Sequence, residues 1–257
     1  MGATRTSKQT PRRSRRLPPH VFLLLLLLLP TTPLSAAPVL YLNTALTSPL
    51  SNAQQSGFVD RLLGEALQRL GYRLRVNHLP AERALINANA GIDDGDLLRI
   101  GGLSELYPNL VQVPEKIIDV EFVAFTRRPD IDLRGWHSLP AYSVAIINGW
   151  KILEQRIPPG TELTKVENNH QLFNLLLKNR VDLVLYSRWP GLSYLQDKRI
   201  RSIRLLRPPL ERRAMFVYLH RRHHALAPRL AHVLAQLKTD GTYQRLFRSI
   251  LSPLMEN

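Results

Sequence analysis

The N-terminal segment constrains this chain most, because it predicts export. Residues 1–20 carry six arginines and lysines and no acid, and residues 21–29 are apolar without a break. Nine helical residues reach only about 14 Å, which is too short to cross a bilayer. Prolines and small residues then lead to Ala36 and Ala37. The pattern predicts a signal peptide over residues 1–36 and a mature protein in the periplasm, with an uncleaved anchor as the alternative.

The net charge falls once this segment is set aside. The chain has 35 Lys and Arg against 20 Asp and Glu, a net charge of +15. Without the six bases of the leader, 29 bases face 20 acids, a net charge of +9. Export and the scattered placement of these bases argue against a nucleic-acid partner. They predict a solvated basic face that attracts anionic surfaces or solutes.

The absence of cysteine excludes disulfides, a thiolate metal site and a cysteine nucleophile. An exported chain without disulfides depends on its apolar core. His220, His223 and His224 are clustered, but Arg221 and Arg222 stand among them and disfavour a divalent cation. We therefore expect no metal and no cofactor.

Strand and helix patterns alternate in the first part of the mature chain. Residues 39–43 and 72–78 have the composition of strands, and residues 58–70 carry one apolar helical stripe that ends at Gly71. Residues 81–90 predict a second helix. The order strand, helix, strand, helix is typical of α/β proteins.

The pattern restarts at about residue 120 and breaks again at Pro208-Pro209. We therefore predict an α/β fold with two lobes, each with its own sheet, joined by two hinge crossovers around a central cleft. The first lobe comprises residues 38–118 plus 212–257, and the second comprises residues 119–211. The remaining predicted strands are 111–113, 120–126, 142–147, 181–186, 203–206 and 215–219, and the remaining helices are 151–156, 170–178 after an Asn169 cap, 226–237 and 243–250.

Four motifs resemble those of the bacterial extracellular solute-binding proteins of family 3, the receptors of polar amino acid importers. The resemblance covers nearly the whole mature region and implies a type II-like periplasmic binding protein fold. The motif glycines Gly71, Gly95 and Gly241 are expected at helix ends, and Asp182 is expected to anchor a strand. The motifs are residues 57–60 with the following helix and Gly71, residues 91–95, residues 178–184 with Asn179 at the family's glycine, and residues 237–243.

The ligand chemistry departs from the family pattern. The family's arginine for a ligand carboxylate is missing from residues 102–107, and its acidic residue is missing from residues 186–189. A standard α-amino acid ligand is therefore in doubt. Arg83 and Arg99 lie nearby in the first lobe and could replace the missing arginine, because a guanidinium binds carboxylate or phosphate in a bidentate manner. The alternative is that both are ordinary surface arginines.

Other candidate ligand contacts follow predicted strands. A turn between a strand and a helix offers backbone N–H groups to an anion, and the resemblance implies that this turn contacts the ligand. Aromatic residues past a strand end could form a wall of the cleft or pack between the lobes. These candidates are Asn148, Gly149 and Trp150 in the turn, the aromatic residues Tyr186 and Trp189, and Asn43 and Thr44 after the first strand.

We therefore expect a monomeric periplasmic solute-binding protein that captures a small polar, anionic or amino-acid-like solute, with an ABC permease of the inner membrane as its candidate partner. The sequence has no Gly-x-Ser-x-Gly, His-Glu-x-x-His or glycine-rich phosphate motif, so we expect no enzyme. Two alternatives stay open. One is a dehydratase-like enzyme acting in the cleft, and the other is a ligand sensor without a permease.

Overall fold

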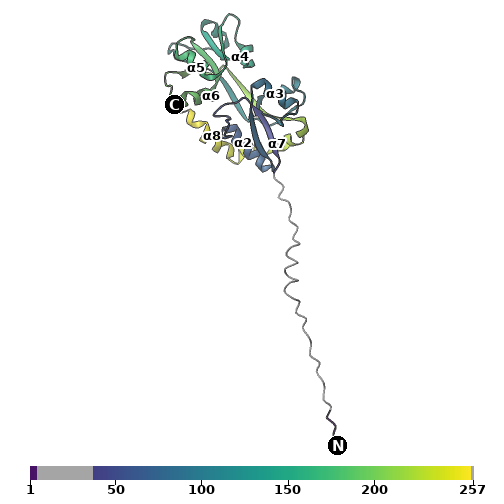
Figure 1. The fold of residues 1–257 in the computed structure, drawn as a ribbon. Coiled ribbons are helices and arrows are strands. Elements are labelled where there is room, and N and C mark those ends of the chain that lie inside the picture. The colour runs from purple at the N-terminus through teal and green to yellow at the C-terminus, as the bar shows by residue number, and fades with distance from the viewer. Residues whose placement is uncertain (5–36, 256–257) are drawn as a thin grey trace. The chain divides into compact units, whose positions relative to one another are not determined.

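The computed structural model of the chain describes residues 1–4 and 37–255. The chain divides into two units, residues 1–36 and residues 37–257. The predicted leader lies outside the described residues except for its first four. Every described strand and helix belongs to the second unit (Figure 1). No described helix has both the length and the apolar character that crossing a membrane requires.

Ten strands form one sheet in the order β2-β1-β3-β10-β5-β8-β6-β7, with β4 paired to β10 and β9 paired to β5. Strand β1 is parallel to β2 and β3, and β6 is parallel to β7 and β8. The strands are β1 (Val39–Thr44), β2 (Arg73–His78), β3 (Gly95–Ile100), β4 (Leu110–Gln112), β5 (Ile118–Thr126), β6 (Ser143–Ile147), β7 (Glu162–Val166), β8 (Leu183–Ser187), β9 (Arg204–Leu205) and β10 (Glu211–His220).

The two crossovers are the long strands β5 and β10. Strand β5 pairs with β10 through residues 118–122 and with β8 through residues 122–125. Strand β10 continues to β3 through residues 215–219. The expectation of two separate sheets is therefore wrong. The crossovers are themselves strands that pair with each other, and their hydrogen bonds to β3 and β8 join the strands of both lobes into one sheet. The mixed α/β class is confirmed, and the exact lobe boundaries stay a prediction.

Helices cover both ends of the sheet (Figure 1). Around the β1–β3 end, α2 packs with α7 and α8, while α3 contacts β1 and β3. Around the β6–β8 end, α5 contacts β6 and β8, and α6 contacts β5 and β8. The helices are α2 (Phe58–Arg69), α3 (Ala81–Asn89), α4 (Lys151–Arg156), α5 (Asn169–Leu177), α6 (Arg188–Asp197), α7 (Leu226–Thr239) and α8 (Thr242–Ile250).

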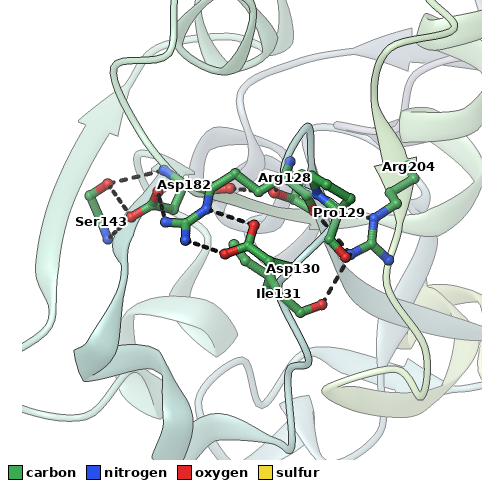
Figure 2. Close-up of polar contacts among 8 residues, drawn as sticks. Arg128, Pro129, Asp130, Ile131, Ser143, Asp182 and Arg204 are labelled. Atoms are coloured by element: carbon green, nitrogen blue, oxygen red, sulfur yellow. Dashed lines mark hydrogen bonds and ion pairs between the residues drawn. The ribbon is translucent and has the colours of Figure 1, made fainter.

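Asp182 anchors the start of β6 beside the start of β8. Its carboxylate accepts hydrogen bonds from the backbone N–H and the hydroxyl of Ser143, each at 3.0 Å, and from Arg128 at 2.8 Å (Figure 2). Arg204 holds the adjacent segment by donating to three backbone carbonyls within residues 128–131 (Figure 2). The predicted anchoring role of Asp182 is therefore confirmed.

The motif glycines serve two different purposes. Gly71 and Gly241 have positive φ, +79° and +84°, as predicted for the ends of helices. Gly95 instead begins β3, where a Cβ atom would lie 2.1 Å from the carbonyl oxygen of Tyr218. The helix-end prediction for Gly95 is wrong, because the close approach of β3 and β10 is what requires a glycine there.

Candidate functional site

Asn43 and Thr44, at the carboxyl end of β1, are fully buried and stabilise the protein itself. The Asn43 amide donates to the carbonyl of Ala84 at 3.1 Å and to Asp93 at 2.9 Å. The hydroxyl of Thr44 accepts from the backbone N–H of Leu46 at 3.1 Å. Of the side-chain polar atoms of these two residues, Oδ1 of Asn43 is the one that is buried without a hydrogen-bond partner. These side chains therefore fix α3 and the loop after β1.

Arg99 forms a bidentate ion pair with Asp96 on the same strand. Its Nε and one terminal nitrogen each lie 2.9 Å from a carboxylate oxygen, and that nitrogen also donates to the carbonyl of Ala81 at 3.0 Å. Asp96 is completely buried, and burial raises its pKa against the opposing charge of Arg99. Because a buried carboxylate needs a partner, Arg99 compensates Asp96 within the predicted first lobe.

Arg83 has a different environment. It lies in the first turn of α3 with an exposed side chain. It makes no hydrogen bond and no ion pair with any residue that the structure describes. Of the two predicted arginines, Arg83 is therefore the one whose guanidinium is open to an external anion.

The Asn148-Gly149-Trp150 turn lies between β6 and α4, as predicted. The N–H of Gly149 donates to a carboxylate oxygen of Glu154 at 3.2 Å, and the same oxygen accepts from Lys165 at 2.9 Å. A carboxylate of the protein therefore occupies the position where an external anion was expected. The side chain of Asn148 is exposed, whereas its backbone N–H donates a hydrogen bond to the carbonyl of Val166.

Trp150 and Tyr186 are brought together by the structure. Their ring centroids lie 4.8 Å apart with an interplanar angle of 30°, and the Trp150 ring also meets Phe122 edge-on at 5.9 Å. Tyr186 is buried, which raises the pKa of its hydroxyl, and the nearby side chain of Thr47, in the loop after β1, opposes this rise. Thr47 belongs to the predicted first lobe and was not among the predicted residues. Because Thr47 lies near Tyr186, the loop after β1 is close to the Trp150–Tyr186 pair.

Trp189 packs between the predicted lobes instead of lining an open surface. It lies on α6, is only 5% exposed, and meets Phe247 of α8 edge-on with centroids 5.7 Å apart. The guanidinium of Arg188 lies 4.8 Å from the centre of its ring. These contacts match the packing alternative that the sequence left open for this residue.

Sequence reasoning missed a charged cluster on the crossovers. Glu121 of β5 accepts a hydrogen bond from Arg188 of α6 at 2.8 Å and another from Arg212 of β10. Burial raises the pKa of Glu121, but the hydrogen bonds from the two arginines outweigh it and hold the pKa below its ordinary value. The sequence contained two hints of this cluster, an acidic residue within a predicted strand and a stretch dense in arginines. The spacing of these residues along the chain does not show which arginine pairs with the acid.

In the histidine cluster, His223 contacts Asp94, which also forms an ion pair with Arg222. One oxygen of Asp94 lies 2.6 Å from Nε2 of His223 and 2.6 Å from a terminal nitrogen of Arg222. Its other oxygen accepts from the backbone N–H of Tyr41. Among residues 37–255, no group of three His, Asp or Glu side chains is arranged to hold a metal ion.

Comparison with known proteins adds one relative in sequence and several in structure. No family model matches the chain. An uncharacterized protein of Shewanella oneidensis is 31% identical over 196 residues, which cover 73% of this chain and 74% of that protein.

Three solved structures share the fold at low sequence identity. A histidine kinase sensor domain with similarity to periplasmic binding proteins has a TM-score of 0.71 and 15% identity, covering 84% of this chain and 96% of its own. An ancestral arginine-binding protein bound to arginine has a TM-score of 0.69 and 14% identity, covering 84% and 100%. An ancestral amino acid-binding protein, described as a precursor of cyclohexadienyl dehydratase, has a TM-score of 0.67 and 16% identity, covering 83% and 96%.

These likenesses show the two-lobe periplasmic binding protein fold, in which the crossovers β5 and β10 join the lobes. The sequence identity to the Shewanella protein extends over most of both chains. The chain therefore belongs to one family with the uncharacterized protein of Shewanella oneidensis, and it has the fold of the extracellular amino-acid-binding proteins.

Proposed function

We propose that this protein is an exported solute receptor that closes its two lobes on a small polar solute. The observation that carries the proposal is the pair of crossover strands within a fold that amino-acid-binding proteins share. Two connections between lobes allow hinge closure, and a solute that contacts both lobes would stabilise the closed state. Delivery to an ABC permease is the candidate next step.

The proposed solute lies between Arg83 and the Trp150–Tyr186 pair. The guanidinium of Arg83 is free to pair with a carboxylate or phosphate group. The half-buried Trp150 ring, which packs on the buried Tyr186, suits a planar or apolar part of the solute. Arg99 contributes through the terminal nitrogen that Asp96 and Ala81 leave unused. Asn148 lies in the same turn as Trp150, with an exposed side chain.

The first experiment is a thermal-shift screen of the protein purified after expression of the full chain. Amino acids, dicarboxylates, phosphorylated metabolites and polyamines would be tested at equal ionic strength. A ligand at 100 times its Kd adds about 2.7 kcal/mol to the stability. A hit confirmed by calorimetry supports the receptor. A compound that is converted to product by the purified protein would instead favour the dehydratase-like enzyme.

The second experiment locates the site once a solute is found. Arg83→Ala should weaken an anionic solute by about tenfold or more, because a charge-assisted contact is lost. Arg229→Ala is a matched control, since Arg229 is also an exposed helical arginine without a described partner. Equal affinities of the two variants would show that Arg83 is not a ligand residue.

A sensor without a permease is the second candidate function. It is favoured by the likeness to the histidine kinase sensor domain, which has the highest TM-score of the three structures described. The transport receptor and the sensor would bind the same solute, but the first would dock on a permease and the second on a kinase. Crosslinking of the solute-loaded protein in the periplasm, followed by identification of the partner as a permease or a kinase, separates them.

A further inference from the structure

A small cavity lies where the second lobe meets the crossover strands. Its volume is about 170 Å³, and its lining includes Glu121, Arg188, Arg207 and Arg212. At about 30 Å³ per molecule this is room for roughly six waters, which suits a small oxyanion with one or two waters. Three guanidinium groups and one carboxylate therefore line a space of that size.

The charges of this lining are not balanced. Each oxygen of Glu121 is occupied by a different arginine, Arg188 or Arg212, and Arg207 adds a third positive charge. The side chains of Arg188 and Glu121 are only 13% and 14% exposed, so water screens the charges of this pair incompletely. Arg212 is 60% exposed and Arg207 is also exposed, so these two charges lie at the solvent side of the cavity. The four charged residues of the lining therefore have a net charge of +2.

A donor in this cluster is also unsatisfied. The Nε–H group of Arg188 is buried and has no hydrogen-bond partner. A buried donor left unpaired is unfavourable, and an acceptor atom placed there would remove that cost. Arg188 is also the first residue of α6, whose N-terminus is not capped by any side chain. The helix dipole favours negative charge near this N-terminus.

We propose that this cavity is a binding site for a small oxyanion, with a phosphate, sulfate or carboxylate group held by Arg188, Arg212 and Arg207. Glu121 positions Arg188 and Arg212. Glu121 and Phe122 are neighbours in β5, so their side chains leave opposite faces of the sheet. The oxyanion site is therefore on the face opposite the Phe122–Trp150 contact. The oxyanion site is therefore distinct from the proposed solute site.

An anion here would join three parts of the molecule. Arg188 belongs to α6, Arg207 to the segment before β10, and Arg212 to β10 itself. A bound oxyanion would therefore connect a helix of the second lobe to a crossover strand. The expected effect is that the anion raises the thermal stability of the hinge region.

A matched control lies on the same strands. Glu211 of β10 is paired with Arg156 of α4 and with Arg213, each at 3.2 Å. This cluster again joins a helix of the second lobe to β10 through a glutamate, but none of its three residues lines the cavity. Arg212 and Arg213 are neighbours on one strand and face opposite ways. Arg213→Gln is therefore the control for Arg212→Gln.

The test is a titration of the protein, purified after expression of the full chain, with phosphate and with sulfate at constant ionic strength set by chloride. The unfolding temperature should rise in a saturable manner for the wild type and for Arg213→Gln. For Arg212→Gln the apparent Kd should increase about tenfold. A second readout is the ¹⁵N–¹H resonance of Arg188 Nε, assigned with Arg188→Lys, which should shift with the same midpoint.

Three outcomes would overturn the proposal. The first is a response that does not saturate or leaves the Arg188 Nε resonance unchanged. The second is an equal response of Arg212→Gln and Arg213→Gln. The third is loss of the response in Arg83→Ala, which would place the anion at the proposed solute site. A solute that still binds Arg212→Gln with wild-type affinity shows that the two sites are separate, so either proposal can fail alone.

Discussion

The carboxylate of Glu154 accepts a hydrogen bond from the backbone N–H of Gly149, in the turn where the sequence predicted a bound anion. The protein thus fills this position with its own negative group, which Lys165 also contacts. A solute that reaches the turn with an anionic group must displace this carboxylate or bind beside it. A solute with a neutral or cationic group at that point would not meet this competition.

The first prediction follows from this arrangement. Glu154→Gln keeps the shape of the side chain and removes its charge, so an anionic solute should bind about two- to fivefold more tightly. Calorimetry with the solute found in the screen measures the change. Glu162→Gln, an exposed substitution at the start of β7, is the control. Weaker binding to Glu154→Gln would mean that the carboxylate contacts a positive group of the solute.

Arg99 should be needed for folding as much as for binding. Arg99→Ala leaves the carboxylate of Asp96 buried without its partner, which should cost about 3–5 kcal/mol of unfolding free energy. Urea unfolding measures this. Arg134→Ala removes an exposed pair with Asp132 and should change the stability little. Similar losses in both variants would show that the Asp96 pair is not critical.

Asp182 should contribute to the acid limit of stability. Burial raises its pKa, but the hydrogen bonds from Arg128 and Ser143 outweigh it and hold the pKa below its ordinary value of 3.8. A folded-state pKa below the unfolded one gives stability that is present above the unfolded pKa and is lost as the pH falls through the folded pKa. Asp182→Asn should therefore lower the unfolding temperature above about pH 4 and lower it less at more acidic pH.

Thermal unfolding between pH 2 and pH 7 checks this prediction. Asp197→Asn is the control, because Asp197 is exposed and has no described hydrogen bond. If the difference between wild type and Asp182→Asn did not shrink at acidic pH, the charged form of Asp182 would not be the stabilising one.

Gly191 should tolerate no side chain. A Cβ atom there would lie 2.3 Å from the ring of Phe125, so Gly191→Ala should overpack the interface of α6 and β5 and cost about 1–3 kcal/mol. Gly64 of α2 has nothing within 4 Å of such an atom, and Gly64→Ala should stabilise the helix by up to about 1 kcal/mol. Chemical denaturation of both variants measures whether the unfolding free energy falls for Gly191→Ala and rises for Gly64→Ala. The double variant Gly191→Ala, Phe125→Leu should recover part of the loss.

Elements with a clear apolar pattern were predictable from the sequence. The helix expected at residues 58–70 is α2 over Phe58–Arg69, because its buried residues lie on one stripe. Helix α6 was missed, since Pro190 and Gly191 stand in its first turn and it has no polar face. Strand β10 is longer than the predicted 215–219, because charged residues 211–213 extend it. The cap of α5 is Asn168, one residue before the predicted Asn169, since its side chain accepts from the N–H of Gln171.

The site was less predictable than the fold. Position near a strand end selected Trp150 and Tyr186, whose rings meet in space, although Tyr186 lies within β8 and not after it. Their contact with a solute stays a prediction. Position along the chain could not show that Arg99 would pair with a buried acid three residues earlier, or that Glu154 would reach back to Gly149. These pairings depend on side-chain direction in the folded chain. Tertiary contacts decide that direction, and no local pattern records it.

The pairing of β5 with β10 also sets how the molecule can open. The two crossovers are joined by backbone hydrogen bonds over residues 118–122 and 211–215, so neither can rotate about a single bond on its own. Relative motion of the lobes must be spread along this ribbon as a change in its twist. The amide hydrogens of this ribbon would stay protected from exchange while the lobes move on either side.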